Sequence, residues 1–251
     1  MKKRVITLVA MAILVLGLVA CNKEGSEPVS ALNYQYIFMN AEVGDIVSFG
    51  HYEQDNDLSN GAEEIEWHVL SAEITPNGLY KELYIISEYV LDCQQYNEEY
   101  VSRVELTSSD LYKWLKDTFF NTAFTTEEQA YIGGEHPSHY ADKIGLLTQA
   151  QLEKYFENGD AAMTDATPYA LAQAKKNGES SERIAWWLAD METSYVDYGW
   201  GDGGHQLEGQ KCMLNGSVYT INSSYHVNNK TVTNWLGVRP TIVIRIDNEQ
   251  N

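Results

Sequence analysis

Residues 65–70, with the sequence IEWHVL, alternate apolar and polar side chains, and the same two-residue period returns near the end of the chain at 242–246. This period is typical of a strand that buries one face against a core. Residues 43–54 and 82–92 are also rich in strand-forming side chains, and turn-forming Asn, Asp and Gly separate the three early segments. The sequence therefore predicts an antiparallel meander followed, at the far end of the chain, by more strands.

The middle of the chain has helical patterns instead. Thr125 with Glu128, and Thr148 with Gln151, have the spacing of capping boxes, and Pro168 follows a capping Thr167. We expect helices over 108–120, 125–132, 149–156 and 166–178, a short strand over 144–148, and later strands over 185–190, 211–221 and 235–247. Strands, then helices, then strands again predict one α+β domain rather than a repeated strand–helix–strand array.

The N-terminus predicts export and lipidation. Lys2, Lys3 and Arg4 precede an apolar run that ends in small residues before Cys21, as in a secretory signal whose cysteine receives lipid. An ordinary membrane anchor is the less favoured alternative, because the run is short and a polar stretch follows at once. We predict a lipoprotein signal peptide at 1–20, a flexible tether at 21–35 that is attached through palmitate and related acyl chains at Cys21, and a single domain at 36–251.

The charge of the chain limits its partners. The formal net charge is −19, and removal of the three basic residues of the signal would bring it to −22. Such an acidic protein is not expected to bind nucleic acid, which attracts basic surfaces. The lipid alone would then hold the protein on the extracytoplasmic face of the cell membrane.

Two cysteines remain once Cys21 is assigned to lipid. Cys93 and Cys212 would form a disulfide in an oxidising compartment, or stay reduced and buried. The sequence leaves both alternatives open. Neither cysteine has the spacing of a zinc site.

The order of the motifs resembles a known family. The segments VSFGHYEQ, EIEWHVL, LYIISEYVLDCQQYN, SSDLYKWLKDTFF, DKIGLLTQAQLEKYF, AWWL and GVRPTIVI, over about residues 43–246, are similar to family 6273 of the domains of unknown function, which are secreted bacterial domains. That family in turn resembles the C-type-lectin-like superfamily, which includes formylglycine-generating enzymes. The resemblance implies paired N- and C-terminal strands, two to four helices between them, and a loop-rich C-terminal lobe that carries the ligand site.

This chain departs from the family after AWWL. Ala189 stands where many relatives carry an arginine, and DMETSYVDYGWGDGG replaces their short turn. The adjacent Trp186 and Trp187 would face opposite sides of a strand, and a core role is favoured for one of them. Trp200 is the favoured stacking platform, because it lies in a glycine-rich loop. The predicted ligand-binding residues are Trp200, Tyr195, Tyr198, Asp197, Asp202 and His205.

No cofactor is required by these patterns, and calcium is the alternative that the acidic loop leaves open. Asp190, Glu192, Asp197 and Asp202 could supply oxygen ligands, but the motifs of a sugar-binding C-type lectin are missing and a solvated loop is favoured. No catalytic motif is evident. We therefore expect a non-catalytic surface lipoprotein that binds a glycan or a protein. An extracytoplasmic enzyme, either a carbohydrate hydrolase or a formylglycine-generating relative, and a structural envelope component are the alternatives.

Overall fold

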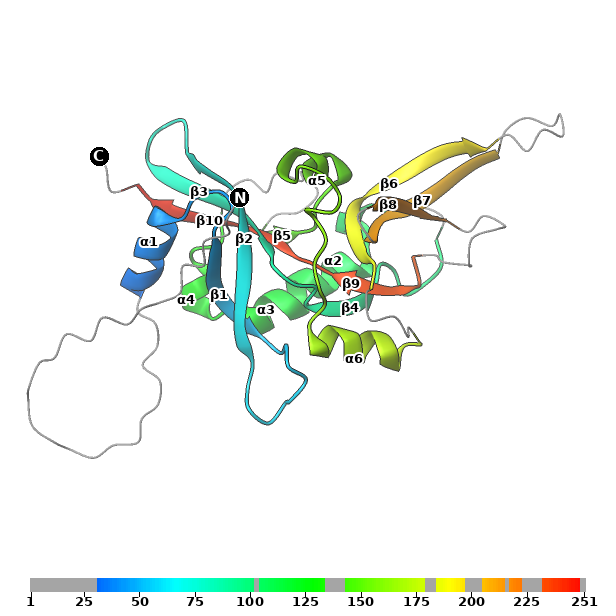
Figure 1. The fold of residues 1–251 in the computed structure, drawn as a ribbon, viewed down its shortest axis with the longest axis horizontal. Helices are drawn as coiled ribbons and strands as arrows, with labels where there is room; N and C mark the ends of the chain where they lie inside the picture. The colour runs from blue at the N-terminus through cyan, green and yellow to red at the C-terminus, as the bar shows by residue number, and fades with distance from the viewer. Residues whose placement is uncertain are drawn as a thin grey trace, which may run out of the picture.

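The computed structural model describes residues 31–101, 104–133, 143–178, 184–196, 205–214, 217–222 and 232–248, and the statements below refer to these residues. Their strands form two five-stranded sheets that lie next to each other along the long axis of the molecule (Figure 1). Helices pack against both sheets. The architecture is α+β, as the sequence predicts.

The first sheet has the order β1-β2-β3-β10-β5. Its strands are β1 (Ile46–Tyr52), β2 (Glu63–Ile74), β3 (Tyr80–Ser87), β10 (Thr241–Asp247) and β5 (Ile144–Gly145). The predicted meander is confirmed, because β1, β2 and β3 pair antiparallel in sequence order. The last strand does not pair with the first, contrary to what the resemblance implies. Instead β10 pairs with β3, from Thr241↔Ile86 to Asp247↔Tyr80, and leaves β1 at the sheet edge.

The second sheet has the order β4-β9-β6-β7-β8. Its strands are β4 (Asp92–Gln95), β9 (Trp235–Val238), β6 (Trp186–Val196), β7 (His205–Leu214) and β8 (Ser217–Asn222). The single strand predicted over 211–221 is wrong, since β7 and β8 pair antiparallel up to Leu214↔Ser217. The two residues that connect them are Asn215 and Gly216, a dipeptide that favours tight hairpins.

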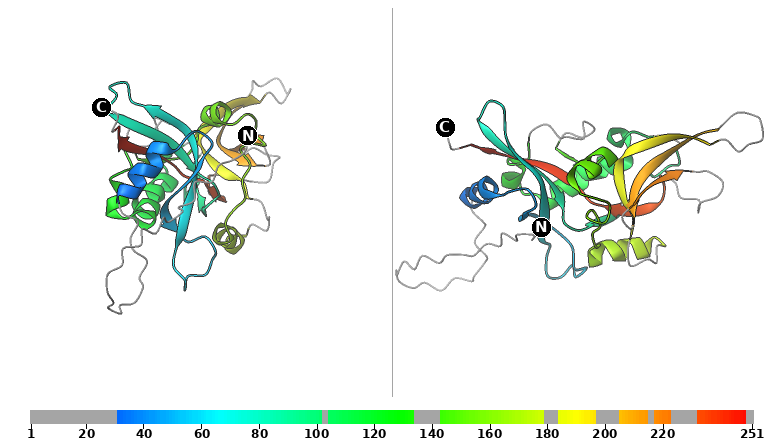
Figure 2. Two further views of the ribbon diagram at one scale, coloured as in Figure 1. Left: turned by 60° about the vertical axis from the view of Figure 1, so that its left-hand side comes forward. Right: turned by 45° about the horizontal axis from the view of Figure 1, so that its top comes forward.

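The strand predicted over 235–247 is likewise two strands, and they belong to different sheets. β9 ends at Val238 and β10 begins at Thr241, so Arg239 and Pro240 mark the change of sheet. A proline has no backbone N–H to donate to a ladder, which suits it to such a break. This segment links the two sheets covalently, as residues 88–91 do between β3 and β4 (Figure 2).

The helices occupy the middle of the chain as predicted. A 3₁₀ turn, η1 (Leu106–Ser108), comes first. One continuous helical segment follows, made of α2 (Asp110–Trp114), the π-helical turn η2 (Leu115–Phe119) and α3 (Phe120–Ala123). The remaining helices are α4 (Thr126–Gln129), α5 (Gln149–Tyr155) and α6 (Pro168–Lys176). Both predicted capping boxes are present, at Thr125 and Thr148, and Thr167 caps α6 with Pro168 in its first turn. The local signals at the starts of α4, α5 and α6 are thus sufficient to place these helices.

A helix at the start of the domain was not predicted. The tether assigned to 21–35 is too long, because α1 (Ala31–Asn40) already begins at Ala31. Its Tyr34 and Phe38 are buried, and both rings contact Phe49 of β1. The hydroxyl of Tyr34 donates to Glu128 Oε1 at 2.8 Å. Burial of these aromatic side chains fixes a segment whose composition alone suggested a linker.

The core consists of two clusters, one on each face of the sheets. Neighbouring residues of one strand point to different clusters: Trp187 to the first and Trp186 to the second, and in β10 Ile242 to the first and Val243 to the second. Helices α1, α2 and α3 cover the first cluster, whereas α5 and α6 cover the second. Both faces of β6 and β10 are therefore covered, whereas the polar residues Glu66 and His68 that alternate along β2 are only partly buried.

A buried carboxyl lies at the start of β4. Tyr52 donates to Asp92 Oδ2 at 2.5 Å, and the backbone N–H of Cys93 donates to Asp92 Oδ1 at 2.6 Å. Asp92 is 2% exposed. Desolvation outweighs these hydrogen bonds and raises the pKa of Asp92, while burial and the neighbouring carboxylate raise the pKa of Tyr52.

Lowering the pH from 7 to 4.5 is expected to stabilise the wild-type protein relative to Asp92→Asn. The pKa of Asp92 is higher in the folded than in the unfolded chain, so protonation of Asp92 favours folding. This gain in the free energy of unfolding is complete below the pKa of the unfolded chain, about 3.9, and is lost as the pH rises through the pKa of the folded protein. Urea unfolding of both proteins at the two pH values measures the difference. A gap between their free energies of unfolding that does not change with pH would contradict the assignment.

Candidate functional site

The hairpin formed by β6 and β7 carries the stretch that the sequence singles out. The two strands stay paired from Met191↔Gln210 to Val196↔His205. Tyr195 pairs with Gln206 and therefore lies in the stem, as does His205. Trp200, Tyr198, Asp197 and Asp202, the other four predicted ligand-binding residues, lie outside the described residues.

The outer part of this hairpin is a two-stranded ribbon. β7 pairs with β8 only from Gly209↔Asn222 onward, so the pairs from Thr193↔Glu208 to Val196↔His205 extend past the third strand. Figure 1 shows the hairpin at one end of the molecule and α1, which begins the described chain, at the other. The first described helix and the hairpin therefore lie at opposite ends of the molecule.

Asp190 has a structural partner at the foot of this hairpin. Its carboxylate accepts a hydrogen bond from the backbone N–H of Gln149, in the first turn of α5. Lys211 Nζ donates to Gln149 Oε1 at 2.7 Å and ties β7 to the same turn. Desolvation raises the pKa of Asp190 despite this hydrogen bond and the nearby positive charge of Lys211. Asp190 thus joins β6 to α5.

The two adjacent tryptophans occupy the two faces of β6, as expected from their spacing. Trp187 is fully buried, and its indole N–H donates to Gln94 O at 2.9 Å. Trp186, on the opposite face, is 3% exposed and pairs in register with Met213 of β7. The stretch AWWL is core, as the sequence favours, but Trp186 also forms part of a pocket.

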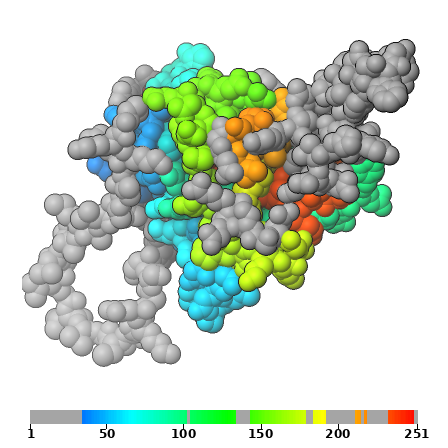
Figure 3. Space-filling view, turned by 45° about the vertical axis from the view of Figure 1, so that its right-hand side comes forward, coloured from blue at the N-terminus to red at the C-terminus, as the bar shows by residue number. Residues whose placement is uncertain are grey.

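This pocket lies where β6 begins and β7 ends, and it has a volume of about 250 Å³. We name it the hairpin-base pocket. Its described lining comprises Ile184, Trp186, Met213 and Leu214 from the sheet side, and Asp160, Met163, Thr164 and Asp165 from the segment between α5 and α6. Figure 3 shows the α5 and α6 region (green to yellow-green) next to β7 and β8 (orange) on this side of the molecule.

Arg239 holds the α5–α6 segment in place behind the pocket. Its Nε donates to Ser87 O at 2.7 Å, its Nη1 to Ala162 O at 3.1 Å and its Nη2 to Glu88 O at 3.2 Å. Burial lowers the pKa of Arg239 to about 10, against the opposing charge of Glu88. The guanidinium carbon also lies 5.4 Å from the centroid of the Trp186 ring. Arg239 thus has a structural role, through its hydrogen bonds to backbone carbonyls.

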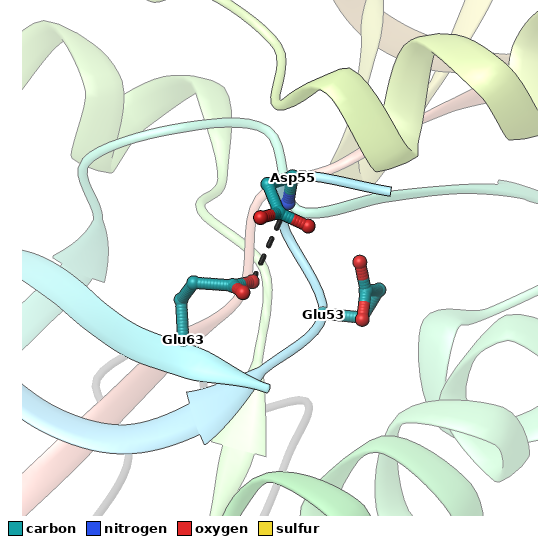
Figure 4. Close-up of side chains that lie close together, drawn as sticks. All are labelled: Glu53, Asp55 and Glu63. Atoms are coloured by element: carbon teal, nitrogen blue, oxygen red, sulfur yellow. Dashed lines mark hydrogen bonds between the residues drawn. The ribbon is translucent and has the colours of Figure 1, made fainter. Parts of the chain in front are cut away.

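Three carboxylates gather elsewhere, where β1 leads into β2. Oxygens of Glu53, Asp55 and Glu63 lie within 4.8 Å of one another (Figure 4). Partial desolvation and the charge of Glu63 raise the pKa of Glu53. Backbone N–H groups of Gln54 and Asp55 donate to Glu63 Oε2, and Asp55 accepts from Asp57 N and Asn60 Nδ2. These hydrogen bonds explain the cluster as a loop closure, so we assign it no metal. The dense run of acidic residues at 53–64 is the signal that could have pointed to it.

The cysteine pair is not bonded. Cys93 and Cys212 are both buried and are not joined as a disulfide. β9 and β6 lie between β4 and β7, so three strand spacings of about 4.8 Å separate the two backbones, well beyond the roughly 7 Å that a disulfide spans. The two thiols also belong to different core clusters. The reduced, buried alternative is the one that the fold supports.

Comparison with family models, curated proteins and solved structures finds no match for this chain. Within the described residues, no helix has both the length and the apolar character needed to cross a membrane.

Proposed function

We propose that this chain is a lipid-anchored, extracytoplasmic binding protein with a C-type-lectin-like fold, which recognises a glycan or a protein at the cell surface through the β6–β7 hairpin. The membrane would hold it by acyl chains on Cys21. The observation that carries the proposal is the opposite placement of α1 and the hairpin along the molecule (Figure 1). A chain anchored ahead of α1 would present the hairpin away from the membrane.

The form of the hairpin supports recognition rather than a purely structural role. Its ribbon extends past β8 on two strands, and an isolated two-stranded ribbon is at best marginally stable in water. The sequence between its strands, DYGWGDGG, combines aromatic side chains with glycines and acids. Tyrosine and tryptophan provide large contact areas at low entropic cost, which suits such a segment to binding a partner.

The enzyme alternative is less well supported by the hairpin-base pocket. A carbohydrate hydrolase places two carboxyl groups on either side of the scissile bond. Here the two carboxylates of the described lining, Asp160 and Asp165, both come from the α5–α6 segment, and the sheet contributes none. The described residues on the other side are apolar. This arrangement favours holding a ligand over cleaving one.

Substitution of Trp200 with alanine is expected to abolish ligand binding without changing stability. The full-length chain would be unfolded thermally in detergent against a panel of glycans and cell-wall fragments, with calcium or with chelator. A ligand at about a hundred times its dissociation constant adds roughly 2.7 kcal/mol, a readily measured shift. Tyr36→Ala is the matched control, because Tyr36 is an aromatic side chain that is 70% exposed on α1, at the other end of the molecule.

If the ligand still raises the melting temperature of the Trp200→Ala protein, and of a variant with residues 197–204 replaced by Asn-Gly, the binding site lies elsewhere. A rise in melting temperature with calcium but without any glycan would show a metal site. If no glycan shifts the unfolding of the wild-type chain, the glycan part of the proposal is wrong. Cross-linking on intact cells, with the shortened hairpin as control, then tests a protein partner.

A further inference from the structure

The hairpin-base pocket combines an apolar floor with an acidic rim. Trp186, Met213 and Ile184 are each at least nine-tenths buried and form the floor together with Leu214. Asp160 and Asp165 are exposed at the rim. Met163, 42% exposed beside them, adds a flexible apolar side chain of the kind that adapts to ligands.

The polar groups of the described lining require a ligand that donates. They are two carboxylates, which accept only, and Thr164, whose hydroxyl already donates to Glu88 O. Arg239, whose guanidinium carbon lies 5.4 Å from the centroid of the Trp186 ring, has its Nε, Nη1 and Nη2 each bonded to a backbone carbonyl. A ligand with a positive charge and an apolar stem would satisfy both the rim and the floor.

The acidic wall is built before any ligand arrives. Val90 N donates to Asp165 O at 3.1 Å and Thr167 N to Val90 O at 3.0 Å, so a short parallel bridge joins the segment to the chain between β3 and β4. Arg239 fixes the same segment through Ala162 O. Such preorganisation lowers the ordering cost of binding.

We propose that the hairpin-base pocket binds a primary ammonium group carried on a short apolar stem. The stem lies on Trp186 and Met213, and the ammonium lies between the carboxylates of Asp160 and Asp165. A volume of about 250 Å³ is below the usual range for drug-sized ligands, roughly 300–1,000 Å³, and suits a group the size of one side chain. A free alkylamine and a lysine side chain of a peptide offer the same chemistry. This site is separate from the hairpin tip and does not rest on the proposed function.

Isothermal titration of the full-length chain in detergent tests the proposal with three probes: 1-aminohexane, its neutral isostere 1-hexanol, and the blocked tripeptide acetyl-Gly-Lys-Gly-amide. We expect 1-aminohexane to bind at least tenfold more tightly than 1-hexanol. Tighter binding of the tripeptide than of the free amine would identify a polypeptide as the source of the ammonium. The reverse order would identify a small amine.

The variants locate the site. Asp160→Asn and Asp165→Asn are each expected to weaken amine binding several-fold, and the double variant at least tenfold. Asp117→Asn, an equally exposed carboxylate on the helical segment, is the matched control and should leave binding unchanged. Met163→Trp should block the pocket, whereas Trp200→Ala should have no effect on this readout. Equal binding of 1-hexanol, undiminished binding by the double variant, or an equal loss in Asp117→Asn would overturn the proposal.

Discussion

Replacing Arg239 with methionine is expected to lower the free energy of unfolding by about 3–5 kcal/mol. Methionine roughly matches the length of the side chain but removes the donors to Ser87 O and Ala162 O, whereas Glu88 O keeps the hydrogen bond from the Thr164 hydroxyl. A hydrogen bond to a charged group contributes about 1.5–3 kcal/mol, and a buried group left unsatisfied costs a similar amount. The same substitution also releases the link between β9 and β10 from the α5–α6 segment, which forms one wall of the hairpin-base pocket. Urea unfolding at pH 7 measures the loss.

Two further variants define what the guanidinium contributes. Arg239→Lys keeps the charge but not the planar fork, so it should recover only part of the loss. Arg245→Met is the matched control, because Arg245 is 40% exposed and pairs with Glu82 near the surface. Exposed pairs of this kind contribute about 0–1 kcal/mol. Equal destabilisation by Arg239→Met and Arg245→Met would show that the hydrogen bonds of Arg239 to backbone carbonyls are not what stabilises the fold.

Replacing Trp187 with alanine should destabilise the protein by about 3–5 kcal/mol, the usual cost of truncating a buried tryptophan. The indole is fully buried, packs edge-on against Tyr96 at 5.2 Å between ring centroids, and donates to Gln94 O. For a domain of this size the loss corresponds to a fall in melting temperature of roughly 10 °C. Differential scanning calorimetry measures it.

Trp187→Phe separates packing from hydrogen bonding. It keeps most of the aromatic contact but removes the donor to Gln94 O, so we expect a smaller loss of about 1–3 kcal/mol. Tyr36→Ala, on the exposed side of α1, should change stability by less than about 0.5 kcal/mol. Equal melting temperatures of the Trp187→Ala and Tyr36→Ala proteins would contradict the assignment of AWWL to the core.

Local signals in the sequence predict much of the fold. The alternation at Ile65, Trp67 and Val69 predicts β2, and the capping boxes at Thr125 and Thr148 predict where α4 and α5 begin. The change of sheet at Arg239 and Pro240 was missed because the apolar pattern is almost continuous through it. α1 was missed because its core contacts are made with residues distant in the sequence, such as the Tyr34 contact with Glu128.

The hairpin-base pocket could not be predicted in the same way. Its lining comes from residues 160–165, 184–186 and 213–214, and none of these segments has a motif of its own. Only the pairing of Trp186 with Met213, and the straps from Val90 and Arg239, bring them together. The hairpin itself was recognisable because its aromatic and glycine residues are contiguous in the chain.

Residues 235–247 would carry mechanical load between the two ends of the protein. At about 3.3 Å per residue they cover roughly 40 Å, from the second sheet to the end of the first. The far end lies beside α1, where Gln35 Nε2 donates to Asp247 O at 2.7 Å. A pull between the proposed membrane anchor ahead of α1 and the proposed ligand on the hairpin would in part run along β10. The ladder from Thr241↔Ile86 to Asp247↔Tyr80 would then be loaded in shear, so that its hydrogen bonds resist together rather than one after another.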